Sequence, residues 1–342
     1  MGESENADEN QISTGDTMRE RADESKIKLW LLIGANRQFV TGVLSVTFFG
    51  LFMLGSIVDP TLSDLLQERN VIESLYTQMI GALITGVTLV VTISQLIISQ
   101  ENGPLGVQRT RMSETMDFRG YIKELTGKPA PADPSAFLRE IIDATQERAE
   151  TLDEVTESTD NDQLRDEVDE FVDSITGNAE TVREKLDGAK FGTFDVVYAS
   201  MDYNYSWNIF QIERLLADHE DDIDGEQRDA LEDLRTSFAM FGPAREHIKT
   251  LYFQWELINL SRYILYAAIP ALLVSGMMLA FVDTATVTGR ILGVETLLWL
   301  VGATFTITLV PFFLLTSYIM RVATAAKRTL AIGPLILRDS QR

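Results

Sequence analysis

Four long apolar runs dominate the hydrophobic pattern of the chain. They cover residues 39–58, 76–99, 263–282 and 296–320. Each run has about 20 residues or more, so a helix made of it rises roughly 30 Å and crosses the hydrocarbon core of a bilayer. The first run begins too late and is too long to be the apolar part of a cleaved signal peptide. The pattern therefore predicts an all-α integral membrane protein with four transmembrane helices.

The second run carries a regular line of small and polar residues. Its members lie three or four positions apart, so a helix arranges them in one continuous stripe. They are Ser74, Thr77, Gly81, Thr85, Thr88, Thr92, Gln95 and Ser99. Five apolar residues are expected to point away from this stripe, and Val87 and Val90 among them to face lipid. They are Leu83, Val87, Val90, Ile93 and Ile97.

Two interpretations of the stripe are open. It is a packing seam against another helix, because Gly81 and Thr85 form a small-xxx-small step and threonine hydroxyls bond their own helix backbone. Alternatively it lines a path in an oligomer, where the hydroxyls and Gln95 contact hydrated ions. The stripe extends over roughly six turns or more, which is longer than one packing contact requires.

Basic residues beside the runs predict the orientation of the chain. On the side that holds both termini they are Lys26, Lys28, Arg37, Arg109, Arg111, Lys249, Arg262, Arg321, Lys327, Arg328 and Arg338. The loops on the other side, residues 59–75 and 283–295, carry only Arg69 and Arg290. Cytoplasmic flanks of transmembrane helices are enriched in Lys and Arg. We expect a multi-pass protein of the plasma membrane with cytoplasmic N- and C-termini.

The segments outside the runs differ in character. Residues 1–25 are polar and acidic, which predicts a disordered tail. Residues 26–38 suit a short interfacial helix with Trp30 at headgroup depth. Residues 100–262 are expected to form a cytoplasmic α-helical domain inserted between the second and third spans, and residues 321–342 a cytoplasmic tail.

Helical patterns fill most of the inserted segment. Asp133 is expected to cap a helix from Pro134 to about Glu157, which pairs with a second helix from about Asp162 as an antiparallel hairpin. One aromatic helix is predicted over residues 193–218. A helix over 226–241 and another from Pro243 follow, the latter running on into the third span.

Composition narrows the chemistry. The net charge is -22 and the basic residues are mostly Arg, which resembles the composition of proteins from salt-in halophiles. The chain has no Cys, so disulfides and thiolate sites are excluded. The acidic turn after Asp218 matches only the first half of a calcium-loop pattern, because Leu231 occupies the twelfth position. We expect no enzyme activity, no cofactor or metal site and no nucleic-acid partner.

The layout resembles that of the bestrophin anion channels. The run from Val87 to Thr92, VTLVVT, and the turn Glu101-Asn102-Gly103-Pro104 are similar to the second span of that family and the turn after it. Thr77, Gly81 and Thr85 stand where the family has its apolar neck, and residues 321–342 are basic where it has an acidic calcium-binding cluster. The resemblance implies a homopentamer whose second span lines an axial pore.

The sequence therefore favours an oligomeric ion channel or channel-like membrane protein whose stripe lines the path. Its expected partners are membrane lipid, inorganic ions and further copies of the chain. The alternative is a non-conducting scaffold or sensor whose acidic cytoplasmic helices recruit a partner. A small-molecule transporter is a weaker alternative, because no charged residue lies deep in any run.

Overall fold

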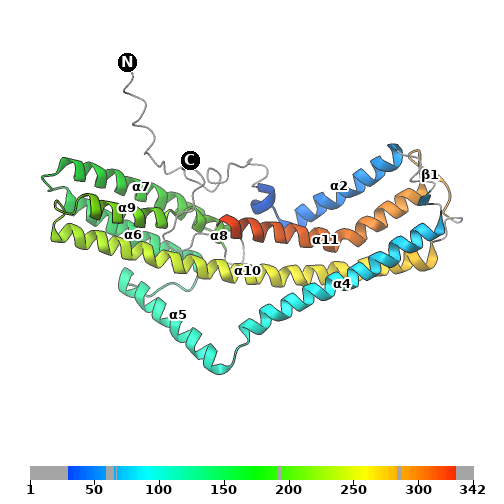
Figure 1. Ribbon diagram of the computed structural model, residues 1–342, viewed down its shortest axis with the longest axis horizontal. Coiled ribbons are helices and arrows are strands. Elements are labelled where there is room, and N and C mark those ends of the chain that lie inside the picture. Colours follow the sequence, from blue (N-terminus) through cyan, green and yellow to red (C-terminus); the bar gives the residue numbers. More distant parts are fainter. Residues whose placement is uncertain (1–29, 59–64, 67, 191–193, 283–286, 329–342) are drawn as a thin grey trace, which may run out of the picture. The chain divides into compact units, whose positions relative to one another are not determined.

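The computed structural model describes residues 30–58, 65–66, 68–190, 194–282 and 287–328 (Figure 1). About 85% of this part is helical. Four helices are long and apolar enough to cross a membrane, which confirms the predicted all-helical fold and the number of such helices. Their bounds are α2 (Arg37–Val58), α4 (Arg69–Glu101), α10 (Gly225–Phe281) and α11 (Thr296–Arg328).

The remaining elements are shorter. They are the π-helical turn η2 (Trp30–Gly34), the helices α5 (Leu105–Thr126), α6 (Pro134–Thr156), α7 (Asp162–Leu186), α8 (Phe194–Met201) and α9 (Tyr205–Asp218), and the strands β1 (Arg290–Ile291) and β2 (Val294–Glu295). The strands pair antiparallel as a small hairpin before α11. Two compact units result: the helical unit, residues 104–253 with 325–328, and the span unit, residues 30–103 and 254–324.

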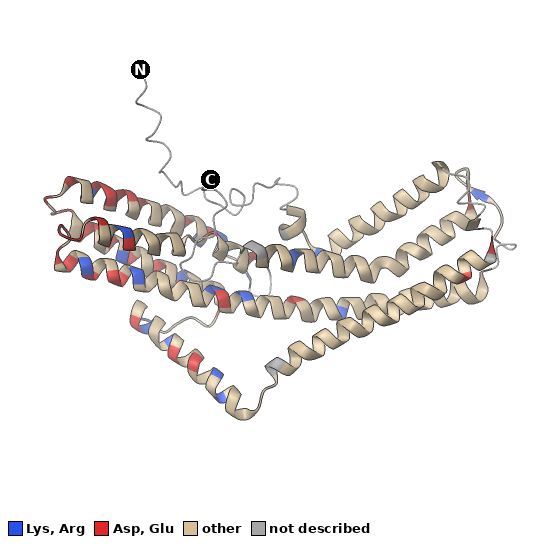
Figure 2. Cartoon of the chain, in the orientation of Figure 1, with Lys and Arg blue, Asp and Glu red and all other residues tan. Residues whose placement is uncertain are grey.

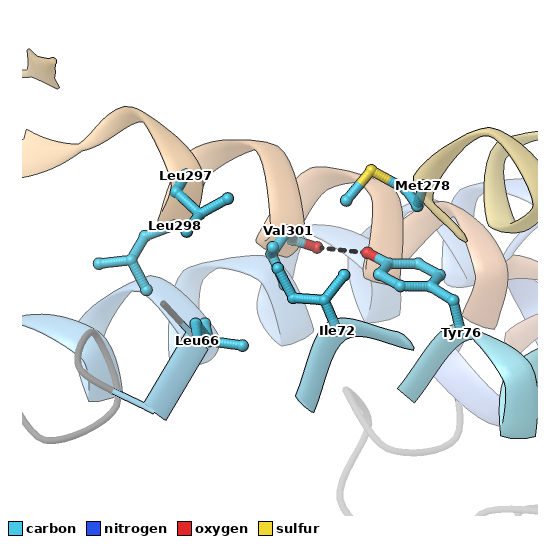
Figure 3. Packing of buried hydrophobic residues seen from close by; sticks show 7 residues of the cluster. All are labelled: Leu66, Ile72, Tyr76, Met278, Leu297, Leu298 and Val301. Atoms are coloured by element: carbon cyan, nitrogen blue, oxygen red, sulfur yellow. Dashed lines mark hydrogen bonds between the residues drawn. The ribbon is translucent and has the colours of Figure 1, made fainter. Parts of the chain in front are cut away.

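Two apolar clusters hold α4 against α10 and α11 in the span unit. One surrounds Tyr76, whose ring lies among Met278, Val301 and their neighbours (Figure 3). The other joins Val90 of α4 to Ile264 of α10 and Leu314 of α11. The large side chains of Leu, Ile, Val, Met and Tyr residues fill both clusters.

Helix α2 packs on α11 through aromatic rings and one glycine. The rings of Phe48 and Phe305 lie 5.5 Å apart in an edge-to-face arrangement. Gly302 of α11 leaves the space that Phe52 occupies, since a Cβ atom there would lie 2.9 Å from the ring. Thr41 and Ser317 share a hydrogen bond of 3.2 Å. Arg37 of α2 also donates to the Ser317 carbonyl at 3.0 Å, so the contact is dense and contains polar links between the two helices.

The helical unit is built on the hairpin of α6 and α7, which lie side by side (Figure 1). Asp133 accepts a hydrogen bond from the Ala136 amide at 2.9 Å, so the predicted cap is confirmed. Asn161 caps α7 in the same way through the Leu164 amide at 3.1 Å. Charged residues are frequent on these helices and on the first half of α10, and sparse on α2, α4, α11 and the second half of α10 (Figure 2).

The prediction of one helix over residues 193–218 is wrong. The helix is interrupted between α8 and α9, at Asp202, Tyr203 and Asn204. Asn178 of α7 holds the break, because its side-chain amide donates to the Asp202 carbonyl at 2.9 Å and accepts from the Asn204 amide at 3.0 Å. Tyr203 can then turn into the core, where its ring lies 4.5 Å from that of Phe241.

The prediction that a helix ends at Phe241 is also wrong, because α10 continues through Gly242 and Pro243. Gly242 does not end the helix but allows a close contact with Tyr205, since a Cβ atom at this position would lie 3.0 Å from the Tyr205 ring. Arg245, one turn on, stacks over the same ring at 4.8 Å. The prediction that one helix continues from the helical unit into the third apolar run is confirmed.

The predicted interfacial helix of residues 26–38 is described only from Trp30 onward. There the chain forms the turn η2 and then enters α2 at Arg37. The predicted disordered tail at 1–25 lies outside the described residues, as do 59–64 and 67 of the loop predicted over residues 59–75. Residues 69–75 of that loop belong to α4, so this helix begins a turn or more before the apolar run.

Candidate functional site

Every residue of the α4 stripe is exposed on the surface of the single chain. The set is Ser74, Thr77, Gly81, Thr85, Thr88, Thr92, Gln95 and Ser99. At Gly81 an added Cβ atom would meet no other atom within 4 Å. No helix of the described chain therefore packs against the stripe, and a seam between helices of one chain is excluded for this part of the molecule.

The opposite face of α4 is the one that the chain covers. Tyr76, Leu83 and Val90 are buried there. Val87 is half-buried against the cluster around Val90. The expectation that Val87 and Val90 face lipid is wrong, because α10 and α11 occupy that side. The stripe and the packing face are thus opposite sides of one helix.

Polar side chains on the two faces of α4 form different kinds of hydrogen bond. On the packing face, the Tyr76 hydroxyl lies 2.5 Å from Thr304 Oγ1 of α11, and Ser94 bonds to Ser261 of α10. On the stripe, Thr88 donates to the Ile84 carbonyl and Thr92 to the Thr88 carbonyl, both at 2.8 Å. Packing-face hydroxyls therefore link helices, whereas these stripe hydroxyls satisfy their own backbone and keep lone pairs that face outward.

An apolar strip runs beside the stripe on the same exposed side of α4. Leu89, Ile93 and Leu96 are its large members, with Leu89 62% exposed. At about 100° per residue they lie next to Thr85 and Thr92 rather than opposite them. The sequence analysis missed this strip and wrongly placed Ile93, which is 45% exposed, on the face opposite the stripe, because it divided the helix into a polar and an apolar half. The signal was present in the spacing of Leu89, Ile93 and Leu96.

The turn after α4 is formed by the predicted residues. Glu101 is the last residue of α4, and the Asn102 amide bonds back to the Ile98 carbonyl at 3.0 Å. Gly103 precedes Pro104, and a residue before proline disfavours the helical conformation. The next helix begins at Leu105. Its first turn is closed by the Gln108 amide, which donates to the Pro104 carbonyl at 3.1 Å. Gly103-Pro104 therefore ends the span and starts a new helix.

The stripe is electrically neutral along its length. Its side chains are hydroxyls, one amide and one glycine, so it supplies hydrogen-bonding groups but no fixed charge and no group that titrates near neutral pH. Such a surface can replace part of the hydration of a passing ion without trapping it. It cannot relay protons through ionisable side chains.

Comparison with known proteins identifies the family. The model of a family described as "Family of unknown function (DUF7972)" matches residues 3–342. The chain belongs to the DUF7972 family. No curated protein and no solved structure matches this DUF7972 protein. Its likeness to the bestrophins rests on the layout and the short motif alone, and it stays a prediction.

Proposed function

We propose that this DUF7972 protein is an oligomeric ion channel or channel-like membrane protein in which the α4 stripes of several copies line a central path. The observation that carries the proposal is that all the stripe residues are exposed while Leu83 and Val90, on the other side of α4, are buried. Polar residues on a membrane-facing helix favour water or a protein neighbour over hydrocarbon. A ring of copies supplies both.

The apolar strip of Leu89, Ile93 and Leu96 supports the same arrangement. A subunit that lines a path with one strip of a helix needs the adjacent strip to contact its neighbour. Exposed apolar residues directly beside the stripe meet that need. We propose a homo-oligomer, and a pentamer if the kinship with the bestrophins holds.

We further propose the orientation that the basic flanks favour. Both termini and the helical unit lie in the cytoplasm, and the helical unit is an insertion between the second and third spans of a plasma-membrane protein. The exposed side chains of Arg109 and Arg262 stand beside the ends of apolar runs on that side. The acidic surface of α6 and α7 suits a cytosol rich in salt (Figure 2).

A non-conducting scaffold or sensor is the second candidate. The observation that favours it is the hydrogen bonding of Thr88 and Thr92 to their own helix, which lets these residues sit against lipid or another copy without water. In that case the stripe joins copies, and the acidic hairpin of α6 and α7 recruits a partner.

Cysteine accessibility decides between the two, because the chain has no Cys of its own. Single cysteines at Thr85, Thr88 and Thr92 are compared with matched exposed positions on the apolar strip, Leu89 and Leu96. Full-length protein in liposomes is treated with a membrane-impermeant thiol reagent. A channel gives faster labelling at the stripe and a loss of ion flux after labelling. Equal labelling rates on the two strips overturn the channel proposal.

A further inference from the structure

Helix α5 is exposed along most of its length. All residues from 105 to 117 except Gln108 are exposed, and Leu105 is 86% exposed. Within the described residues, the last turns of α5 are anchored in the helical unit. There Ile122 is buried and the ring of Phe118 lies 6.1 Å from that of Phe137. The first half of α5 therefore projects a surface that the described chain does not cover.

The uncovered surface of α5 has an apolar line along it. Leu105, Met112 and Met116 fall on one side of the helix at spacings of seven and four, and each is exposed by more than half. The anchored residues Phe118 and Ile122 lie on a different side. The line is therefore free while α5 stays attached to the helical unit.

Charges are sorted around this apolar line. Arg109 and Lys123 lie along it, whereas Glu114 and Asp117 lie on the far side of the helix. Residues 102–113 contain two arginines and no acidic residue, in a chain whose net charge is -22. An apolar line flanked by cations, with the carboxylates turned away, is the pattern of a helix that binds an anionic membrane surface.

The position of α5 in the chain brings that surface to the membrane. Three residues separate Leu105 from Glu101, the last residue of the spanning helix α4. A fully extended chain of that length reaches roughly 14 Å. The start of α5 is thus held within reach of the lipid headgroups by the covalent chain alone.

We propose that the face of α5 formed by Leu105, Arg109, Met112, Met116 and Lys123 binds anionic lipid headgroups at the membrane surface. The apolar side chains enter the boundary between headgroups and acyl chains, and the two cations pair with lipid phosphates. A second copy of the chain fits this face less well, because two such faces would bring their cations together. The proposal stands whether or not the α4 stripe conducts ions.

The test uses a fluorophore on a single cysteine in the full-length protein. Met112→Cys places it on the proposed face, and Thr110→Cys places it on the opposite side of the same turn. Each labelled protein is reconstituted with brominated, quenching acyl chains in two kinds of vesicle: phosphatidylcholine alone, and an equimolar mixture of phosphatidylcholine and phosphatidylglycerol. We expect a blue shift and quenching at position 112 in the mixed vesicles, with little change at position 110.

Removing the cations sharpens the test. Arg109→Gln and Lys123→Gln, made singly on the Met112→Cys background, each lower the ratio of quenched to unquenched label in the mixed vesicles about fivefold. Equal quenching at positions 112 and 110 overturns the proposal, as does equal quenching at 112 in the two kinds of vesicle. A third result also overturns the proposal: a blue shift at position 112 without quenching that disappears when the ratio of protein to lipid is lowered. That result assigns the face to contact with a second copy of the chain.

Discussion

The guanidinium groups of Arg37 and Arg321 converge on one acceptor, the backbone carbonyl oxygen of Ala35, each at 2.5 Å. Arg37 begins α2 and Arg321 lies near the end of α11, so the shared carbonyl ties the entry to α2 to a helix almost three hundred positions away in the chain. Arg37 is only 4% exposed. It also donates to the carbonyls of Leu31, Leu32 and Ser317, at 3.0 to 3.1 Å.

Replacing this arginine should destabilise the span unit. Arg37→Met leaves several buried carbonyls without their donor, and we expect the free energy of unfolding to fall by about 3 kcal/mol or more. The stability of Arg37→Lys should lie between that of the wild type and that of Arg37→Met, because an ammonium group cannot reach as many of these acceptors. Thermal unfolding in detergent measures the effect. Arg290→Met, at an exposed position of β1 in the span unit, is the control, and equal shifts for both variants would contradict the assignment.

Gly302 is expected to tolerate no side chain. In Gly302→Ala the new Cβ atom would lie 2.9 Å from Phe52 Cδ1 and 3.2 Å from Phe49 Cε2, so α2 has to move away from α11. We expect a loss of about 1–3 kcal/mol in the free energy of unfolding. Gly276→Ala in α10 is the matched control, because nothing lies within 4 Å of its added Cβ atom. The same melting temperature for the two variants would show that the α2–α11 contact is looser than described.

Asp153 makes the helical unit sensitive to pH. Burial, followed by the neighbouring Asp169, raises the pKa of the Asp153 carboxyl. The folded state therefore holds this proton more tightly than the unfolded state, and stability falls as pH rises through the raised pKa. Asp153→Asn should raise the melting temperature at neutral pH, and this gain should shrink as the pH falls toward the ordinary pKa of about 4.

Salt separates this charge effect from a packing effect. At 1 M salt the Debye length is about 3 Å, so the part of the Asp153→Asn gain that comes from Asp169, Glu157 and Asp173 should diminish. Glu154→Gln removes a charge from the exposed neighbouring position and should change the melting temperature less. A gain for Asp153→Asn that is the same at every pH and salt concentration would rule out the electrostatic cause.

Thr88→Leu tests the stripe by function. Thr88 is exposed and donates to the Ile84 carbonyl at 2.8 Å, so leucine removes a hydroxyl from the proposed path without disturbing a contact between helices. We expect severalfold lower ion flux in liposomes with assembly intact. Thr316→Leu in α11 is a close control, because Thr316 is also exposed and donates to the carbonyl four residues earlier at 2.9 Å. Similar flux in the two variants would favour the non-conducting scaffold.

Local pattern was enough for the elements that depend on local physics. Four apolar runs became four long helices, because a helix satisfies the backbone hydrogen bonds of a mostly apolar segment without help from water. Asp133 and Pro134 marked the start of α6, since capping involves only neighbouring residues. The line of Thr and Gly residues on α4 was visible because helical periodicity is fixed by backbone geometry.

Contacts between distant segments decided the rest. Asn178 of α7 stabilises the interruption between α8 and α9, and the Tyr205 ring packs against Gly242 inside α10. In both cases the contacting residue lies far along the chain, so the local sequence pattern does not reveal the contact. By itself, the sequence determined that α4 is long and apolar enough to cross a membrane and that it carries a polar stripe. Only the tertiary structure decided that α10 and α11 cover the side of Leu83 and Val90, because burial depends on which other helices pack against a face and not on the periodicity of the helix itself.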